Sequence, residues 1–280
     1  MIKNKLLLCT DMDKTVIPSG PQLEHPDARD RFRAFCSQPN VSLVYVSGWP
    51  LNLVMRAIVE YNLPRPHYAI TDMGTKIYHH HEGVWSDVES WQQSIASAWG
   101  GKSHADLQQA LCSCQDLQLQ ESSKQNDYKL CYSLPLSVPP KQILSWVEQQ
   151  LAKQKIEFEL IWSVDDIKRV GLLDILPRNG GKKDAIEFLR RQLNIELDQV
   201  LFAGDSGNDL PVLSSPIKSV LVANAEPEIR KQAIELAAVY DCSDSLYIAK
   251  SEKNPFDGNY SAGVMQGISF FYPDFKVNRP

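Results

Sequence analysis

Two aspartates lie one residue apart, directly after an apolar segment near the start of the chain. Residues 6–8 are all leucine, Asp11 and Asp13 follow shortly, and Thr15 lies two residues further on. A short apolar run that ends in polar residues is typical of a buried strand whose end reaches the surface. Two carboxylates that face one site repel each other unless a cation lies between them or one of them holds a proton. The spacing therefore indicates metal-assisted chemistry at the end of a strand.

A second acidic cluster follows another apolar segment, far along the chain. Residues 200–203 are apolar, and the string Gly-Asp-Ser-Gly-Asn-Asp that comes next contains Asp205, Asn208 and Asp209. We expect its two glycines to adopt positive φ in a tight turn and to allow close backbone approach to a ligand. The alternative interpretation is an ordinary turn whose Asn and Asp side chains bind their own backbone.

The two acidic segments are expected to meet. The carboxyl ends of parallel strands form one edge of an open α/β sheet, and ligands bind at that edge. Carboxylate oxygens gathered around one point suit the hard cation Mg2+, so Mg2+ is the predicted cofactor. The predicted metal ligands are Asp11, Asp13, Asp205 and Asp209.

A serine and a glycine end a third strand-like segment. Residues 41–46 are mostly apolar, and Ser47 and Gly48 follow. A hydroxyl group and a glycine N–H at a strand end form a small cradle for phosphate oxygens, and a helix that begins there reinforces it. Residues 50–60 indicate such a helix, because Pro50 is near its start and apolar residues share one stripe. A simple helix cap is the alternative role for Ser47.

A lysine follows a fourth strand-like segment. Residues 172–176 lead through Pro177 and two glycines to Lys182 and Lys183, and residues 185–193 have the pattern of an amphipathic helix. A lysine at the start of that helix can deliver a positive charge to a phosphate group and to neighbouring carboxylates. The spacing alone leaves both lysines as alternatives for this role.

These four segments, in this order, resemble the haloacid-dehalogenase superfamily of phosphatases. Within it, the chain is most similar to the sucrose-phosphate phosphatases and related disaccharide-phosphate phosphatases. The similarity includes the strings Leu-Asp-Ile-Leu-Pro before the lysine and Gly-Asp-Ser-Gly-Asn-Asp in the second acidic segment, and it favours Lys182 over Lys183. The residues that match the four motifs are, in chain order, Asp11, Asp13 and Thr15; Ser47; Lys182; and Asp205, Asn208 and Asp209.

The resemblance implies an α/β fold with a Rossmann-like, doubly wound parallel-sheet core and an inserted α+β cap domain. Residues 1–82 and 167–280 are expected to form the core, and residues 83–166 the cap. The segment between the second and third motifs is long enough for this insertion. Its mixture of helix-like and strand-like segments fits a lid over the catalytic edge.

The resemblance also implies a role for each motif residue. Asp11 is the expected nucleophile, which forms an aspartyl-phosphate, because an ionised carboxylate needs no separate base. Asp13 is expected to protonate the departing sugar oxygen and then to take a proton from the attacking water. Thr15 is expected to brace the loop through a hydrogen bond from its side chain to the backbone. The expected phosphate-binding residues are Ser47, Gly48, Lys182 and Asn208.

Sugar recognition is expected to come from the cap and from one residue beside the phosphate cradle. Trp49 stands where the sucrose-phosphate phosphatase branch usually has arginine, so a flat apolar face replaces a fork of donors. Lys129 and Tyr132 resemble that family's sugar-binding Lys-x-Ser-Tyr segment. Core packing is the alternative role for Trp49, and a solvated cap surface is the alternative for the others. Further cap candidates are Asp165, Asp166, Lys168 and Arg169.

The composition fits a soluble enzyme. The chain has 280 residues and a formal net charge of −5, which argues against broad attraction to nucleic acid or to membrane surfaces. No stretch of about 18 apolar residues is present, so no membrane-spanning helix is expected. Six scattered cysteines, together with the lack of an evident signal peptide, indicate a reducing cytoplasm.

The expected function is therefore that of a cytoplasmic, Mg2+-dependent sugar phosphatase. The resemblance implies sucrose 6-phosphate or a similar disaccharide phosphate as substrate, with mannosylfructose phosphate and glucosylglycerol phosphate as alternatives, and a functional link to a sugar-phosphate synthase. Two other classes stay open. A non-catalytic sugar-phosphate-binding module would be expected to have lost a catalytic carboxylate, and a phosphomutase would share the aspartyl-phosphate step.

Overall fold

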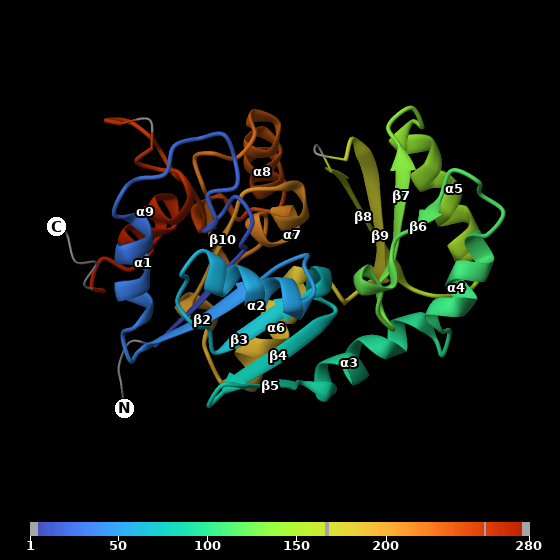
Figure 1. The fold of residues 1–280 in the computed structure, drawn as a ribbon, viewed down its shortest axis with the longest axis horizontal. Helices are drawn as coiled ribbons and strands as arrows, with labels where there is room; N and C mark the ends of the chain where they lie inside the picture. Colours follow the sequence, from blue (N-terminus) through green and yellow to red (C-terminus); the bar gives the residue numbers. More distant parts are fainter. Residues whose placement is uncertain (1–4, 166–167, 255, 276–280) are drawn as a thin grey trace.

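The computed structural model describes residues 5–165, 168–254 and 256–275, and within these ranges it contains two β-sheets (Figure 1). The strands of the large sheet, in spatial order, are β12 (Leu246–Ile248), β11 (Lys218–Leu221), β10 (Val200–Gly204), β1 (Leu6–Thr10), β2 (Val41–Val46), β3 (Tyr68–Thr71), β4 (Lys76–His81) and β5 (Val84–Asp87). Those of the small sheet are β6 (Gln118–Leu119), β7 (Leu130–Pro135), β9 (Val170–Pro177) and β8 (Phe158–Asp165). The α-helices are α1 (Ala28–Cys36), α2 (Leu51–Glu60), α3 (Glu89–Ala96), α4 (His104–Leu111), α5 (Pro140–Ala152), α6 (Lys182–Gln192), α7 (Leu210–Leu213), α8 (Pro227–Val239) and α9 (Tyr260–Phe271).

The centre of the large sheet is parallel and buried on both faces. β1 pairs in parallel with β2 and β10, and every residue of β1 and β10 is buried. Burial on both faces requires continuous apolar segments, which explains why the strands before Asp11 and Asp205 do not alternate. β4 and β5 extend the sheet in antiparallel fashion. The carboxyl ends of β1, β2 and β10 therefore meet at one edge, which we call the catalytic edge.

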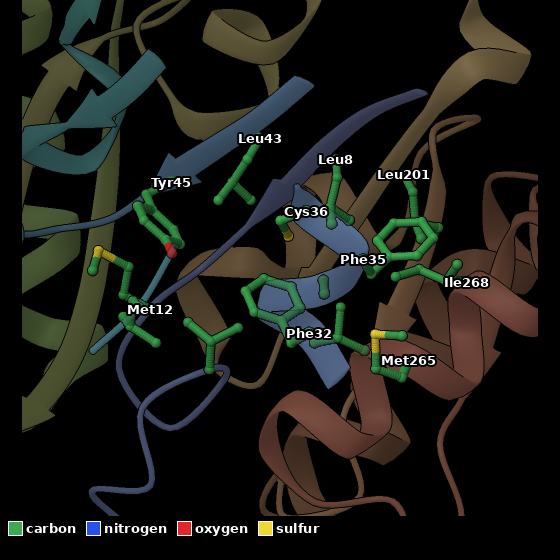
Figure 2. Close-up of a cluster of buried hydrophobic side chains, with 14 of the residues drawn as sticks. Leu8, Met12, Phe32, Phe35, Cys36, Leu43, Tyr45, Leu201, Met265 and Ile268 are labelled. Carbon is green, nitrogen blue, oxygen red and sulfur yellow. The ribbon is translucent and has the colours of Figure 1, made fainter. Parts of the chain in front are cut away.

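Helices cover both faces of this sheet and fix the position of its edge. Figure 2 shows α1 and α9 on one face, where Phe32 and Ile268 pack near Leu8. Gly267 allows α9 this close approach, because a Cβ there would lie 1.9 Å from Val220 of β11. Buried residues of α6, α7 and α8 pack against the opposite face. Each fully buried aliphatic or aromatic side chain in these layers contributes about 1.5–3 kcal/mol to folding.

The small sheet has helices on one face only. Figure 1 shows α4 and α5 on the side that points away from the large sheet. Leu130, Tyr132 and Leu134 of β7 belong to a buried apolar cluster that includes residues of these two helices. Because side chains alternate along a strand, Lys129 and Cys131 point to the opposite face, which turns toward the catalytic edge. We call the small sheet with α4 and α5 the cap.

The predicted fold class is confirmed, but the predicted boundaries cut through both sheets. β5 lies beyond residue 82 and pairs with β4 in the large sheet. β9 lies beyond residue 167, and yet it pairs with β7 and β8 in the cap. An apolar segment such as 172–176 indicates a buried strand, but its pattern does not specify which sheet buries it. The chain thus leaves the large sheet after β5 and returns to the core after β9. None of the helices in the described ranges is both long and apolar enough to cross a membrane.

Candidate active site

Asp11 lies at the catalytic edge, where the ladder between β1 and β10 ends. Its backbone N–H donates to the Ala203 carbonyl at 2.8 Å, and only 5% of the residue is exposed. Beyond it the chain turns sharply, because the Met12 carbonyl accepts the N–H groups of three following residues and Lys14 has a φ of 55°. This turn carries Asp13, whose carboxylate accepts a hydrogen bond from the Ser19 hydroxyl. No local sequence pattern pointed to Ser19.

The second acidic segment forms a short 3-10 turn, η5 (Gly207–Asp209), after β10. One oxygen of the fully buried Asp209 accepts the backbone N–H groups of Asp205 at 3.1 Å and of Ser206 at 3.2 Å. Gly204 is required beside it, because a Cβ there would lie 2.5 Å from Asp209 Oδ2. The expected positive φ at Gly204 and Gly207 is wrong, because neither glycine adopts it. Close packing against Asp209, and not a left-handed backbone, explains why position 204 is a glycine.

A hydroxyl group joins the two acidic segments. Thr15 Oγ1 donates to Asp205 Oδ1 at 3.0 Å, and both residues are buried. The sequence predicted that Thr15 would bond to the backbone of its own loop, and the structure corrects this. The hydrogen bond holds Asp205 at a fixed position relative to the β1 loop, and it is a contact between segments that are distant in the chain.

Lys182 donates hydrogen bonds to three other residues of the site. Its Nζ donates to Asp11 at 2.9 Å, to Asp209 at 2.7 Å and to Asn208 Oδ1 at 2.7 Å, and 3% of the residue is exposed. Lys182 is the first residue of α6, which places its side chain at the catalytic edge. Lys183 lines the same cavity beside the cap as Lys182, but the hydrogen bonds to Asp11, Asn208 and Asp209 are all made by Lys182. The geometry therefore favours Lys182 as the lysine of the site.

The site contains more acidic than basic side chains. Burial raises the pKa of Asp11 to about 7; Lys182 opposes the shift, and Asp209 adds to it. Burial, with the neighbouring Asp11 and Asp209, also raises the pKa of Asp205 well above its usual value. Burial disfavours the charge of Lys182, but Asp11 and Asp209 outweigh burial and raise its pKa. Three carboxylates thus share one ammonium group.

This donor set fits a divalent cation. Oxygens of Asp11, Asp205 and Asp209 lie within 4.8 Å of one another. Hard carboxylate oxygens are the ligands that Mg2+ prefers, and a divalent charge would offset the repulsion among them. The side chain of Asp13, predicted as a fourth ligand, lies outside this group and contacts Ser19.

Ser47 and Gly48 lie at the end of β2, beside the acidic site. The Ser47 N–H donates to Ile70 of β3 at 2.8 Å, and its hydroxyl accepts the Trp49 N–H at 3.1 Å. Helix α2 begins at Leu51, as predicted, and no side chain caps it. The hydroxyl of Ser47 is therefore not a helix cap. It is available as a donor, because it acts only as an acceptor toward Trp49.

Residues 72–74, which follow β3, have a strained backbone and contact the serine cradle. Asp72 and Met73 both have positive φ, of 54° and 64°, and Gly74 has a φ of 119°. A Cβ at Gly74 would lie 2.3 Å from the carbonyl carbon of Gly181, so only glycine fits against the start of α6. The Met73 N–H donates to the Ser47 carbonyl at 3.2 Å. The segment thereby connects the serine cradle with the helix that carries the site lysine.

The three predicted sugar-binding residues have different positions. Lys129 is buried, and its Nζ donates to the Gly48 carbonyl at 3.3 Å and lies 4.0 Å from Asp174 Oδ1. Trp49 is adjacent to Gly48 and packs against the apolar core. Tyr132 lies on the other face of β7, inside the apolar cluster of the cap. Lys129 and Trp49 are thus next to the cradle, and Tyr132 is not.

The charge of Lys129 is balanced by Asp174 of the cap and by Asp72 of the core. Burial disfavours its ammonium form, but Asp174, Cys131 and Asp72 together outweigh burial and raise its pKa. The Cys131 thiol in turn donates to Asp174. Burial raises the pKa of Tyr132 to about 12, and the thiols of Cys112 and Cys114 on the helix side add to the shift.

Three of the other cap candidates, Asp165, Lys168 and Arg169, lie where β8 ends and just before β9 begins. The Lys168 N–H donates to Asp165 Oδ1 at 2.9 Å, and Arg169 has a φ of 54°. Asp166 lies outside the described residues. Asp165, Lys168 and Arg169 thus lie near the end of the strand pair at which Asp165 pairs with Val170.

Two further cap residues beside the core were not predicted from the sequence. Asn126 donates to Thr75 Oγ1 at 2.9 Å, just beyond the strained segment. Asp174 lies on the cap face that turns toward the catalytic edge, opposite Cys131 in the sheet register. A single aspartate within the apolar segment 172–177 is the signal that could have identified Asp174.

Comparisons with known proteins agree with this geometry. The family model described as sucrose-6F-phosphate phosphohydrolase matches residues 4–272. An HAD-like hydrolase of Nitrosococcus oceani is 40% identical over 276 residues, which cover 99% of this chain and 74% of that protein. The mannosylfructose-phosphate phosphatase of Agrobacterium fabrum is 30% identical over 229 residues, which cover 80% of this chain and 85% of that protein. The chain spans about half the length of several plant sucrose-phosphatases that it also matches.

A solved structure shares the fold over most of the chain. The sucrose-phosphatase of Synechocystis sp. PCC6803, determined in complex with sucrose and phosphate, superposes with a TM-score of 0.76. The alignment covers 96% of this chain and 98% of that one, at 23% sequence identity. The likeness therefore extends over both the core and the cap.

Proposed function

Because the chain belongs to the sucrose-6F-phosphate phosphohydrolase family and is a sugar phosphatase, we propose that it hydrolyses a disaccharide phosphate through an aspartyl-phosphate on Asp11. The observation that carries the proposal is the position of the Lys182 ammonium. It bonds to Asp11, Asn208 and Asp209 at the catalytic edge, beside the Ser47 cradle. A phosphate group placed there meets a nucleophile on one side and hydrogen-bond donors on the others.

In the first step, Asp11 acts as the nucleophile. One of its carboxylate oxygens attacks phosphorus, the bond between phosphorus and the sugar oxygen breaks, and an aspartyl-phosphate forms. Lys182, the Ser47 hydroxyl and the Gly48 N–H hold the phosphoryl oxygens as charge moves between them. Asp13 gives its proton to the departing sugar oxygen, so the sugar leaves as a neutral alcohol.

In the second step, water cleaves the intermediate. Asp13, now ionised, takes a proton from a water molecule, whose oxygen attacks phosphorus while the bond to Asp11 breaks. Inorganic phosphate leaves, and Asp13 again holds a proton. The Ser19 hydroxyl, which donates to Asp13, fixes the orientation of this carboxylate for both proton transfers.

Mg2+ is the proposed cofactor of both steps. Asp11 and Asp205 would hold it, together with the backbone carbonyl of Asp13, and Asp209 would orient Asp205 and Lys182. When bound, the cation neutralises the approaching anions and stabilises the transferring phosphoryl group. Thr15 and Asn208 keep Asp205 and Lys182 in place around it.

Sucrose 6-phosphate is the first proposed substrate, because relatives named as sucrose-phosphatases match most of the chain. Mannosylfructose phosphate is the second, because a mannosylfructose-phosphate phosphatase is 30% identical. The chain also resembles part of a glucosylglycerol-phosphate synthase, which supports a functional link to a sugar-phosphate synthase. Lys129 and Trp49 are the proposed sugar contacts nearest the cradle, and Tyr132 would act through cap packing.

The test is phosphate release from a panel of sugar phosphates, with Mg2+ and with EDTA, beside the Asp11→Asn variant. Metal-dependent release from one disaccharide phosphate, abolished in the variant, supports the mechanism and identifies the substrate. Release that persists in EDTA contradicts the role of the cation. A wild-type protein that binds sugar phosphate without releasing phosphate would instead be a regulatory module, and transfer of the phosphoryl group to a second hydroxyl of the sugar would indicate a phosphomutase.

A further inference from the structure

A cavity of about 510 Å³ lies on the outer side of the cap. It is bounded by residues 113–116, which follow α4, by residues 137–139, which follow β7, and by the first turns of α5. Because α4 and α5 cover the face that points away from the large sheet, the small sheet lies between this cavity and the catalytic edge (Figure 1). The volume lies within the range of about 300–1,000 Å³ that is typical of small-molecule sites.

One wall of this cavity is apolar and is fixed by the core of the cap. Ile143 belongs to the buried apolar cluster, and the half-buried Trp146 and Val138 pack against it. The Val138 N–H donates to the Pro135 carbonyl at 3.1 Å, which closes the turn after β7. The ring of Pro139 then fixes the backbone where α5 begins. A wall that is already in place loses little conformational entropy when a ligand binds.

The rest of the lining is polar, and its side chains are free to bind a ligand. Five exposed residues supply hydroxyl, amide and carboxylate groups: Ser113, Gln115, Asp116, Ser137 and Gln142. None of these five side chains makes a hydrogen bond or an ion pair with another residue in the described part of the chain. Their hydrogen-bonding capacity is therefore left to water, which a ligand with several hydroxyl groups can replace.

We propose that this cavity is a carbohydrate site separate from the active site, and that it binds a neutral mono- or disaccharide. A sugar ring has an apolar face of C–H groups and a rim of hydroxyl groups. The flat indole of Trp146 can cover the apolar face. The amides of Gln115 and Gln142 both donate and accept, as the hydroxyl groups of the rim require.

The charge of the lining selects against phosphorylated sugars. Lysine and arginine are absent from the described residues that line the cavity, and Asp116 is the charged side chain among them. A phosphate group would therefore find no cation to pair with and would be repelled by this carboxylate. The cavity thus suits a free sugar, such as a sugar phosphatase releases, whereas the catalytic edge suits the phosphate ester.

The experiment follows the indole N–H signal of Trp146 in two-dimensional NMR spectra of the full chain. The Trp146→Phe variant lacks this signal, which assigns it, and keeps an aromatic ring in the wall. The wild type is titrated with sucrose, with glucose and with glucuronate, in which a carboxylate replaces the primary alcohol of glucose. Both neutral sugars should shift the signal along a saturable curve. Glucuronate should bind about two- to fivefold more weakly than glucose, because Asp116 repels it.

Gln142→Ala should raise the Kd of glucose about two- to tenfold, because a neutral hydrogen bond is lost. Gln149→Ala is the matched control, since Gln149 is an exposed residue of the same helix that does not line the cavity. Its Kd should equal that of the wild type. The proposal is overturned if neither neutral sugar shifts the Trp146 signal, if glucuronate binds as tightly as glucose, or if the two alanine variants have the same Kd. Melting curves of both variants show whether a loss arises from unfolding, and none of these readouts depends on phosphate release.

Discussion

The catalytic edge of the core and the facing side of the cap both contain buried lysine and aspartate. At the core edge, Lys182 lies within 3 Å of oxygens of Asp11 and Asp209, and Asp205 is near both. In the cap, Lys129 is 4.0 Å from Asp174, which also accepts a hydrogen bond from the Cys131 thiol. The core edge thus has an excess of carboxylate charge, whereas in the cap one carboxylate is paired with one ammonium group.

The difference indicates that the core edge and the cap have different functions. Buried like charges are costly, and they persist where a cation or a reaction uses them. A balanced pair such as that in the cap has no need of a further ion, and it can hold one conformation or one contact. We therefore expect changes at the core edge to remove activity, and changes in the cap to alter substrate preference.

Asp11→Asn is expected to have the largest effect. The amide cannot form the aspartyl-phosphate, so kcat should fall by about four orders of magnitude or more. The variant should also be at least as thermostable as the wild type without metal, because it removes one of three mutually repelling carboxylates. Steady-state kinetics and melting curves provide both readouts. Residual activity within tenfold of the wild type would mean that another group is the nucleophile.

Lys182→Met is expected to have the next largest effect. It removes an ammonium group that contacts the nucleophile, and kcat/KM should fall about 10²–10³-fold. Lys183→Met is the matched control, because it changes the same charge one residue away on a half-buried side chain. Its loss should be less than about tenfold. Equal losses in the two variants would contradict the assignment of Lys182.

The sequence identified most of the core edge, and the physical reason is clear. Carboxylates that directly follow continuous apolar segments can only lie at the ends of buried strands, so Asp11 and Asp205 were found from local pattern. Contacts between distant segments have no such local signal. The hydrogen bond from Thr15 to Asp205 and that from Ser19 to Asp13 became visible only in the structure.

The cap was harder to interpret from the sequence, because a match to a family's sugar-binding segment does not show which face of a strand each residue occupies. Lys129 and Tyr132 are three residues apart on an extended segment, and an odd separation places them on opposite faces. The alternation alone could have removed Tyr132 from the set of direct sugar contacts. Assignment of 172–176 to the core failed for a different reason: an apolar central strand looks alike in either sheet.

Lys129→Met should have a moderate effect that is confined to binding. The variant loses the hydrogen bond from Nζ to the Gly48 carbonyl and leaves Asp174 without its cation. We expect kcat/KM to fall about tenfold, mainly through KM, because a charged hydrogen bond beside the cradle is lost. Tyr132→Phe is the control on the other face of β7, and its kcat/KM should change less than about twofold. The reverse order of the two losses would restore Tyr132 as the sugar contact.

The smallest expected effect tests the charge excess of the core edge directly. Asp11 and Asp205 have pKa values above their usual range, so the folded state binds protons that the unfolded state has already released. For such groups, stability falls as pH rises from the unfolded pKa near 4 to the folded value of about 7 that burial gives Asp11. In EDTA, the melting temperature should therefore decrease between pH 5 and pH 7.5. The melting temperature of the Asp11→Asn variant should decrease less over this pH range. Its decrease should be about 2–4 °C smaller than that of the wild type, which is the change that about 1 kcal/mol produces in a protein of this size.

Mg2+ should reverse this trend, because it binds the ionised carboxylates and competes with their protons. The gain in melting temperature on addition of Mg2+ should be larger at pH 7.5 than at pH 5, and smaller in the Asp11→Asn variant at both values. Lys129→Met should show the same gain as the wild type, because the pair in the cap contributes no carboxylate to the metal group. An equal gain at both pH values would mean that the cation binds outside the group of Asp11, Asp205 and Asp209. The excess of carboxylate charge would then have to be explained by the reaction alone.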